Sequence, residues 1–282
     1  MANFYLEITP QSNSFFLHWR ELWMYRDLIW LFVRRDFVAL YKQTILGPIW
    51  FFIQPIFTTI VFTVIFGSVG GLNPTGVPSF LYYLAGIVLW NYFSETLLKT
   101  SNTFIENQHL FGKVYFPRLT VPISIVISNL LKMGVQFVLF IGVFLMYYLK
   151  GQVQIQFTIL LFPLLLFLLA ILGMGTGIFI SAVTTKYRDL RFLVQFGVQL
   201  LMYVTPGIIL SYDMIVQRFP KFSWIADLNP LYPIIETFKN GWLSAGTFSW
   251  ESLFISAVIA LLTLLISVGI FNRTEQNFMD TV

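Results

Sequence analysis

The sequence predicts an all-α integral membrane protein with six transmembrane helices, and three observations support that prediction. Apolar residues make up 57% of the 282 residues and charged residues only 11%, whereas roughly 25% of the residues in a soluble domain are charged. Six stretches are long and apolar enough to cross the hydrocarbon core of a bilayer, which takes about 20 helical residues. Basic residues are concentrated in alternate connections between these stretches. The chain is therefore expected to cross the membrane repeatedly.

Residues 1–45 are predicted to form a cytoplasmic region that ends in an amphipathic interface helix. The first twenty residues are polar and lack the apolar core of a cleaved signal peptide. In the helix that follows, apolar and basic side chains fall on opposite arcs, so we expect it to lie on the membrane surface and to contact headgroups and protein. A merely basic flank that orients the first span is the alternative. The apolar arc holds Leu28, Ile29, Phe32, Val33 and Leu40, and the basic arc holds Arg34, Arg35 and Lys42.

The region 46–271 is predicted to be one six-helix transmembrane domain, followed by a cytoplasmic tail at 272–282. An even number of spans returns the C-terminus to the side of the N-terminus. With both termini inside, four basic residues fall in outer segments and the other thirteen fall inside, as the positive-inside rule requires. The outer four are Lys150, Arg218, Lys221 and Lys239. The spans cover residues 46–67, 80–99, 120–148, 157–181, 192–212 and 250–271.

Proline and glycine punctuate the fourth and fifth spans. Pro163 and Pro206 each remove a backbone donor, so each is expected to bend its helix. Gly173, Gly175 and Gly177 recur at every second position and not at every fourth, so we interpret them as sites of close helix packing or of local flexibility, with packing favoured, rather than as a GxxxG dimer motif.

The outer segment before the last span is too long for a turn and too apolar for a soluble loop. Within it, Asn229 and Pro230 interrupt the chain, and Leu231–Leu243 is a short amphipathic stretch. About 13 residues cannot cross a bilayer, but they suit a re-entrant or interfacial helix. A helix that rests on the outer surface fits the composition equally well.

Polar residues inside the predicted spans are functional candidates because they are costly in lipid. Glu95 and Lys99 lie one turn apart on the second span and can pair with each other. Gln195 and Gln199 place two amides on one face of the fifth span, where they either line a polar pathway or cross-link helices. Because Glu95 is the only candidate for a buried carboxylate within the spans, the sequence does not favour a proton-coupled carrier.

Several kinds of chemistry are not expected of this chain. It has no cysteine, and its two histidines lie far apart in the sequence, so no disulfide, thiol nucleophile or metal site is predicted. No soluble domain carries a basic patch, so nucleic-acid binding is not expected. Gly112 and Lys113 lack the upstream glycine and the following serine or threonine of a P-loop. Energy from ATP must therefore come from another chain.

Four runs in order resemble the ABC-2 type permease family, in particular its exporters of lipid-linked polysaccharide such as O antigen, capsular polymer or teichoic acid. The runs are RRDFVALYKQTILGPIWFFIQP, NQHLFGKVYFPRLTVP, TTKYRDLR and LNPLYP. The resemblance covers essentially the whole chain and implies a protein of the bacterial inner membrane. It implies two copies of this chain with two copies of a separate ABC ATPase, which binds ATP and Mg²⁺, and no cofactor on the permease. The implied cargo is a polymer on a polyprenyl diphosphate lipid.

The resemblance also implies roles for particular residues. The first cytoplasmic loop would couple to the ATPase through Asn107, Gln108, His109, Leu110, Phe111, Lys113, Phe116, Pro117 and Arg118. The second cytoplasmic loop holds Lys186, Tyr187, Arg188 and Asp189. Channel-lining candidates on the first and fifth spans are Trp50, Phe51, Gln54, Gln195, Gln199, Tyr203 and Tyr212. Outer gate candidates are Asn229, Pro230 and Tyr232, and candidates for binding the lipid diphosphate or headgroups are Arg34, Arg35 and Lys42.

Two other functions remain open at this point. An ABC-2 exporter of a small amphiphile, a drug or haem would share the fold, but it would be expected to hold a closed apolar pocket instead of a continuous channel. A channel or scaffold that needs no ATPase is a more distant alternative.

Overall fold

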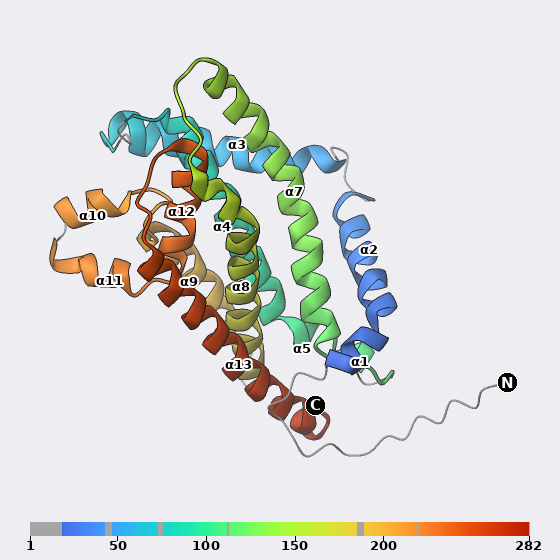
Figure 1. Ribbon diagram of the computed structural model, residues 1–282. Helices are drawn as coiled ribbons and strands as arrows, with labels where there is room; N and C mark the ends of the chain where they lie inside the picture. Colours follow the sequence, from blue (N-terminus) through green and yellow to red (C-terminus); the bar gives the residue numbers. More distant parts are fainter. Residues whose placement is uncertain are drawn as a thin grey trace.

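The computed structural model describes residues 19–42, 47–72, 76–111, 113–184, 189–218 and 220–281. The regular elements within these ranges are all helices, and no strand occurs among them. The long helices form an elongated bundle (Figure 1). The predicted all-α fold class is therefore confirmed. The long helices are α4 (Ser79–Ser101), α7 (Thr120–Leu149), α8 (Phe162–Thr184) and α13 (Trp250–Thr281).

Helix α4 is the central helix of the bundle. It packs against α7 and α8 along its length, and α3 (Trp50–Phe62) and α12 (Leu231–Leu243) also contact it. Most of its side chains are buried, and they form the middle of the main apolar core. Of the polar residues on α4, the serines and threonines at positions 94, 96, 100 and 101 are buried, whereas Asn91, Glu95 and Lys99 are half-buried.

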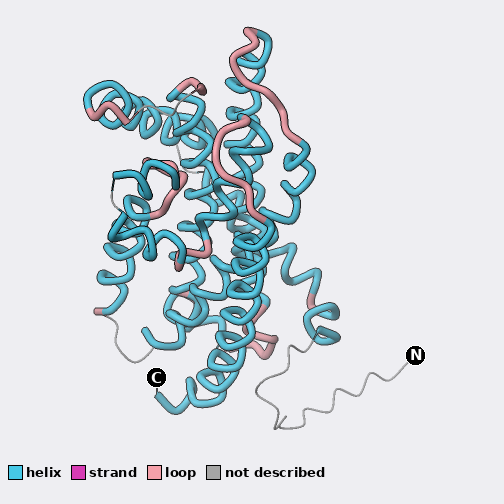
Figure 2. The backbone as a smooth tube through the Cα atoms, turned by 60° about the vertical axis from the view of Figure 1, so that its left-hand side comes forward, coloured by secondary structure: helices cyan, strands magenta, loops and turns pink. Residues whose placement is uncertain are grey.

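A second apolar core lies at one end of the bundle, which we call the terminal end. It joins α1 (Trp19–Met24), α2 (Arg26–Lys42), the α4–α7 connection and the part of α13 around Val268 and Phe271. Within the connection are two short helices, α5 (Thr103–Glu106) and α6 (Gln108–Phe111). Figure 1 shows α1, α5 and the end of α13 together here, with α10 (Tyr212–Arg218) and α12 toward the opposite end. The connection from α7 to α8 runs back along the outside of that opposite end (Figure 2).

Four helical segments are long and apolar enough to cross a membrane, and they correspond to the first, third, fourth and sixth predicted spans. The second predicted span is α4, whose polar residues lower its hydropathy. The fifth is α9 (Leu190–Val204), whose 15 residues extend only about 22 Å at 1.5 Å per residue. The chain is thus a multi-pass membrane protein, and the count of six remains a prediction. The four segments are Trp50–Val69, Thr120–Leu149, Phe157–Thr184 and Trp250–Thr274.

Three predicted boundaries differ from the structure. Helix α9 ends at Val204, so the predicted span 192–212 is too long, and Pro206 follows the end of the helix instead of bending it. Pro163 lies in the first turn of α8, where a proline is tolerated because its missing N–H has no helical partner. Helix α13 continues through residue 271 to Thr281, so the predicted tail is not separated from the last span.

The glycines of α8 confirm the prediction of close packing. A Cβ atom on Gly177 would lie 1.7 Å from Thr100 Oγ1 on α4, and one on Gly173 would lie 3.1 Å from the Thr96 side chain. Gly175 faces the backbone of α13 instead. Gly173 and Gly177 are four residues apart, so they do have GxxxG spacing, and it serves a contact within the chain.

Helix α2 runs beside α7, whereas α3 lies across the bundle at the end opposite α1 (Figure 1). On the apolar arc of α2, Phe32 and Val33 are buried at 5% and 1% exposed, and Leu28 and Ile29 are half-buried, while Arg34 is exposed. The expected contact with protein is therefore present. Contact of α2 with a membrane surface stays a prediction.

Candidate functional site

The predicted coupling loop, residues 107–118, has an exposed part and a buried part. Val114 and Tyr115 are 61% and 63% exposed. Among the other described residues of the loop, His109 and Lys113 are exposed, while Gln108, Leu110 and Pro117 are half-buried. The buried residues are Asn107, Phe111, Phe116 and Arg118. Only part of the predicted set is thus placed to meet another protein.

Phe116 and Arg118 anchor this loop to the bundle. The Phe116 ring lies 5.7 Å from the ring of Phe111 and 5.8 Å from that of Phe32 on α2, and the Arg118 guanidinium lies 5.3 Å from the Phe111 ring. These residues were expected at the ATPase contact, but the structure packs them inside the loop. The coupling helix expected near Asn107 to Val114 includes Val114, but the candidate residues named from the sequence omit both Val114 and Tyr115. The signal for them was two apolar residues directly after Lys113 with no helical face to bury them.

The second cytoplasmic loop is described only in part. Lys186, Tyr187 and Arg188 lie outside the described residues. Asp189 is exposed in the turn before α9.

The headgroup candidates on α2 differ in their exposure and in their contacts. Arg34 and Lys42 are exposed. The Arg35 guanidinium makes a 2.8 Å salt bridge to Asp36 and lies 4.8 Å from the Phe32 ring. The charge of Arg35 is therefore already partly balanced by its neighbour.

Polar side chains cross-link α4 and α7 in three successive pairs, which we call the polar ladder. The Asn91 amide donates to Gln136 Oε1 at 3.5 Å, and Lys99 Nζ donates to Asn129 Oδ1 at 3.0 Å. Between them Lys132 Nζ makes a 2.5 Å salt bridge to Glu95 Oε1. Glu95 therefore pairs across to the next helix instead of with Lys99 as expected. The ladder holds Asn91, Glu95 and Lys99 on α4 and Asn129, Lys132 and Gln136 on α7.

The channel-lining candidates fall into two groups. Tyr203 is 48% exposed, and Gln195, Gln199, Trp50 and Gln54 are exposed as well. Of the residues of α9, all of which are described, Val198 alone is buried. Helix α9 therefore presents amide and aromatic side chains on faces that this chain leaves open. Phe51, by contrast, is 5% exposed, 6.5 Å from the ring of Phe37, and Tyr212 lies beyond α9.

The predicted short outer helix is α12, with the same bounds, Leu231–Leu243. It does not rest on the surface of the bundle. Nearly all of it is buried, and Phe238 and Trp242 pack against Phe140 with ring centroids 5.5 and 5.6 Å apart. The alternative of a surface helix therefore does not describe its place in the chain.

The outer gate candidates connect α12 to the end of α9 and to α10. Asn229 Nδ2 donates to Thr205 Oγ1 at 3.0 Å, while its Oδ1 accepts the Leu231 N–H at 3.0 Å. The Tyr232 ring stacks on that of Tyr212 at 4.6 Å. Asp227 accepts a 2.8 Å hydrogen bond from the Tyr212 hydroxyl, and this bond, together with burial, raises the pKa of Tyr212 to about 12.

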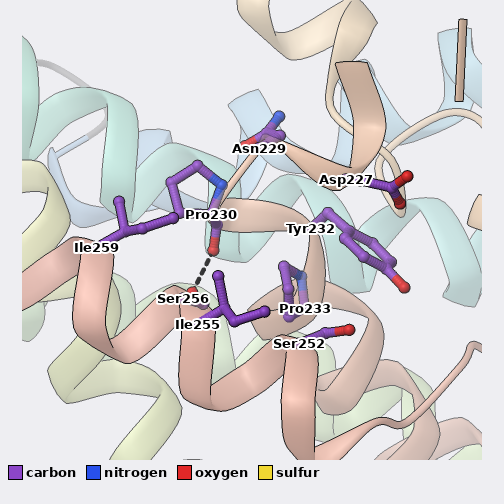
Figure 3. Close-up of a pocket in the computed structure, with 9 residues that line it drawn as sticks. All are labelled: Asp227, Asn229, Pro230, Tyr232, Pro233, Ser252, Ile255, Ser256 and Ile259. Carbon is purple, nitrogen blue, oxygen red and sulfur yellow. Dashed lines mark hydrogen bonds between the residues drawn. The ribbon is translucent and has the colours of Figure 1, made fainter. Parts of the chain in front are cut away.

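These gate residues line a pocket of about 180 Å³ between the start of α12 and α13 (Figure 3). The Ser256 hydroxyl on α13 donates to the carbonyl of Pro230 across its floor. Asp227, Tyr232 and Ser252 form a polar side of the pocket, and Pro233 and Ile255 form an apolar one. The remaining lining residues are Asn229, Pro230, Ser256 and Ile259.

Glu236 and Lys239 are the polar residues that sequence reasoning missed. Both are 0% exposed on α12, although Lys239 had been placed among the outer basic residues. The signal was an acid and a base three residues apart within an otherwise apolar stretch. Among the described residues, no group of three or more histidine, aspartate or glutamate side chains is arranged to hold a metal ion.

Comparison with known proteins identifies the relatives of this chain. The family model described as ABC-2 type transporter matches residues 27–243. Two proteins from Klebsiella pneumoniae, each named O-antigen export system permease protein RfbA, are 27% and 25% identical, over 90% of this chain and 94% of theirs. A protein of the same name from Myxococcus xanthus is 24% identical over 93% of this chain and 98% of its own. Because the family match runs from α2 to the end of α12, this chain belongs to the ABC-2 type transporter family.

Proposed function

We propose that this chain is the permease subunit of an ABC exporter that moves a polysaccharide on a polyprenyl diphosphate lipid outward across the bacterial inner membrane. One observation carries the proposal: three relatives named as O-antigen export permeases align over nine-tenths or more of this chain. The family match supports the role of membrane subunit. A separate ABC ATPase binds ATP and Mg²⁺ and supplies the energy.

In this proposal six helices cross the membrane, and both termini are cytoplasmic. The spans are α3, α4, α7, α8, α9 and α13, with α12 as a re-entrant gate helix. The charge distribution supports this orientation, because thirteen of the 17 basic residues fall in the segments that it assigns to the cytoplasmic side. We therefore refer to the opposite end, with α10 and α12, as the outer end.

A second copy of this chain completes the pathway. Gln195 and Gln199 are exposed on α9, and an amide is costly in contact with lipid. Two copies that meet near α9 and α3 would enclose these amides with Gln54 and Tyr203 in a polar, aromatic channel. Sugar rings can stack on such aromatic surfaces.

The exposed part of the coupling loop is the proposed ATPase contact. His109, Val114 and Tyr115 face outward at the terminal end, and Phe116 directly after them packs on Phe32 of α2. A push on the exposed residues would therefore reach α2 and, through it, the start of α3.

The test is reconstitution of the purified permease with the ATPase that co-purifies with it. We expect ATP hydrolysis to rise several-fold with polyprenyl diphosphate-linked polysaccharide and to rise less with the same lipid without the glycan. Stimulation by haem or small amphiphiles, without any response to the glycan lipid, would contradict polymer export. If no ATPase co-purified, the proposal of an ATP-driven exporter would fail.

A further inference from the structure

Two opposite charges are fully buried at the outer end of the bundle. Glu236 and Lys239 lie one turn apart on α12, and neither is exposed. Charged side chains are almost never fully buried unless they are paired or hydrogen-bonded. Their partners come from other elements, and those partners indicate what the two residues hold in place.

Glu236 holds the connections on both sides of the gate helix. Its Oε1 accepts the N–H of Tyr212, the first residue of α10, at 3.2 Å. Its Oε2 accepts the N–H of Thr247, in the connection from α12 to α13, at 3.0 Å. One carboxylate thus fixes two segments that are far apart in the sequence.

Lys239 fixes the same region to α4. Its Nζ donates to the carbonyl of Gly207, in the connection from α9 to α10, and lies 3.1 Å from the centroid of the Tyr82 ring on α4. A Cβ atom on Gly86, one turn further along α4, would lie 3.0 Å from the Gly207 oxygen and 3.5 Å from Lys239 Nζ. Glycine at position 86 therefore permits the close approach that this contact needs.

The connections fixed in this way are suited to movement. Gly207 and Gly246 have φ angles of +85° and +94°, which only glycine adopts readily. The Tyr82 hydroxyl has no hydrogen-bond partner among the described residues although Tyr82 is 2% exposed. A buried hydroxyl without a partner costs free energy. A movement that gives the Tyr82 hydroxyl a partner would recover that free energy.

We propose that Glu236 and Lys239 are positioning residues that hold the outer gate closed by fixing the connections around α12 to the outer end of α4. At its other end α4 leads through α5 into the coupling loop, which begins with α6. The central helix α4 therefore joins the ATPase contact to the gate. In this proposal, movement of α4 at the ATPase contact releases the gate. This inference rests on the proposed function, because it assumes a gate that opens during export.

The test measures access to the gate in the complete complex with its ATPase. The chain has no cysteine, so an Ile208→Cys variant, whose residue is 0% exposed beside Gly207, carries a single thiol at the gate. We expect a membrane-impermeant maleimide to label it slowly without ATP and at least fivefold faster during ATP turnover. Leu228→Cys, at a residue 67% exposed, serves as the control that is always labelled.

The charges are then removed in the Ile208→Cys background. Glu236→Gln or Lys239→Met alone leaves one buried charge uncompensated, whereas the double variant removes both and is expected to fold. The double variant should be labelled at least fivefold faster without ATP and should retain ATP hydrolysis while export falls about tenfold. Glu95→Gln with Lys132→Met, a pair that contacts neither connection, is the matched control and should leave Cys labelling slow.

Two outcomes would overturn the inference. Slow labelling with normal export in the Glu236→Gln, Lys239→Met variant would mean that the charges serve stability alone. Fast labelling of an Ile178→Cys variant, at a buried residue near the terminal end, in the same double background would mean general unfolding. Neither outcome bears on the proposed function, which is tested separately by co-purification of the ATPase and by the response of the unmodified complex to the glycan lipid.

Discussion

Helices α4 and α9 both carry polar side chains, but those of α4 are bonded within the chain and those of α9 are exposed. Asn91, Glu95 and Lys99 on α4 find partners on α7, whereas Gln195 and Gln199 on α9 are left exposed. A polar residue in a membrane helix is therefore not by itself a sign of a transport pathway. The useful distinction is whether the same chain already satisfies it.

The largest expected effect comes from adding a methyl group that faces α4 and comparing it with one added on α9. Gly177→Ala on α8 places a Cβ atom 1.7 Å from Thr100 Oγ1 and 2.7 Å from the Leu97 carbonyl on α4. Because backbone must move, we expect a loss of about 3 kcal/mol in stability. Gly197→Ala on α9 meets nothing within 4 Å and should leave stability unchanged or raise it by about 1 kcal/mol. Thermal unfolding of the purified chain measures both, and equal losses would contradict the contrast.

The coupling loop offers a second pair of buried and open residues. Phe116→Ala removes a ring that is 5% exposed and should lower stability by about 3 kcal/mol. Tyr115→Ala, at a side chain 63% exposed, should change stability by less than about 0.5 kcal/mol while weakening association with the ATPase. Thermal unfolding and co-purification separate the two effects. If Tyr115→Ala unfolded the chain, the assignment of the exposed surface would be wrong.

The polar ladder and the core glycines show what the sequence can and cannot reveal. The helix type followed from apolar runs of about 20 residues, although α9 is shorter and α13 longer than predicted. Helix α12 was found with its bounds because Asn229 and Pro230 mark its start. Partners could not be read in the same way. Glu95 has Lys99 one turn away in the sequence, but the antiparallel packing of α7 brings Lys132 within 2.5 Å. Likewise, only packing reveals that Phe116 is inside the coupling loop and that Lys239 is buried.

Removing one member of the ladder tests whether α4 depends on its partners. Lys132→Met leaves Glu95 without its salt bridge, and we expect a loss of about 2 kcal/mol, less than for a fully buried pair because the two side chains are 13% and 23% exposed. Adding Glu95→Gln should restore most of the loss. A double-mutant cycle on thermal unfolding gives the coupling energy between the two residues. A coupling energy near zero would mean that the pair does not stabilise the bundle.

The matched change on α9 should affect transport and not stability. Replacing Gln195 and Gln199 with leucine removes two exposed amides that have no role in the core, so unfolding should shift by less than about 0.5 kcal/mol. If these amides line the channel between two copies, export should fall about tenfold, because each desolvated amide lost removes a hydrogen-bonding group for sugar hydroxyls worth about 1 kcal/mol. Normal export in this variant would exclude α9 from the pathway.

The smallest expected effect concerns α2, which has both kinds of face on one helix. Phe32 and Val33 are buried, while Arg34 and Lys42 are exposed, and a cation near an anionic membrane surface gains about 1 kcal/mol. Arg34→Gln should therefore raise the half-saturating concentration of the lipid-linked substrate in the ATPase assay about fivefold if Arg34 meets the diphosphate.

Arg35→Gln is the matched control for that variant. The Arg35 guanidinium is already bound to Asp36 at 2.8 Å, so its removal should shift the half-saturating concentration by less than twofold. Higher salt should reduce the effect of Arg34→Gln, because exposed charges are screened within about 10 Å at 0.1 M ionic strength. Equal effects of the two substitutions would mean that α2 responds to the overall charge of the membrane and does not bind the diphosphate. Direct binding to the diphosphate should depend more on Arg34 than on Arg35, because Arg35 already forms a salt bridge with Asp36.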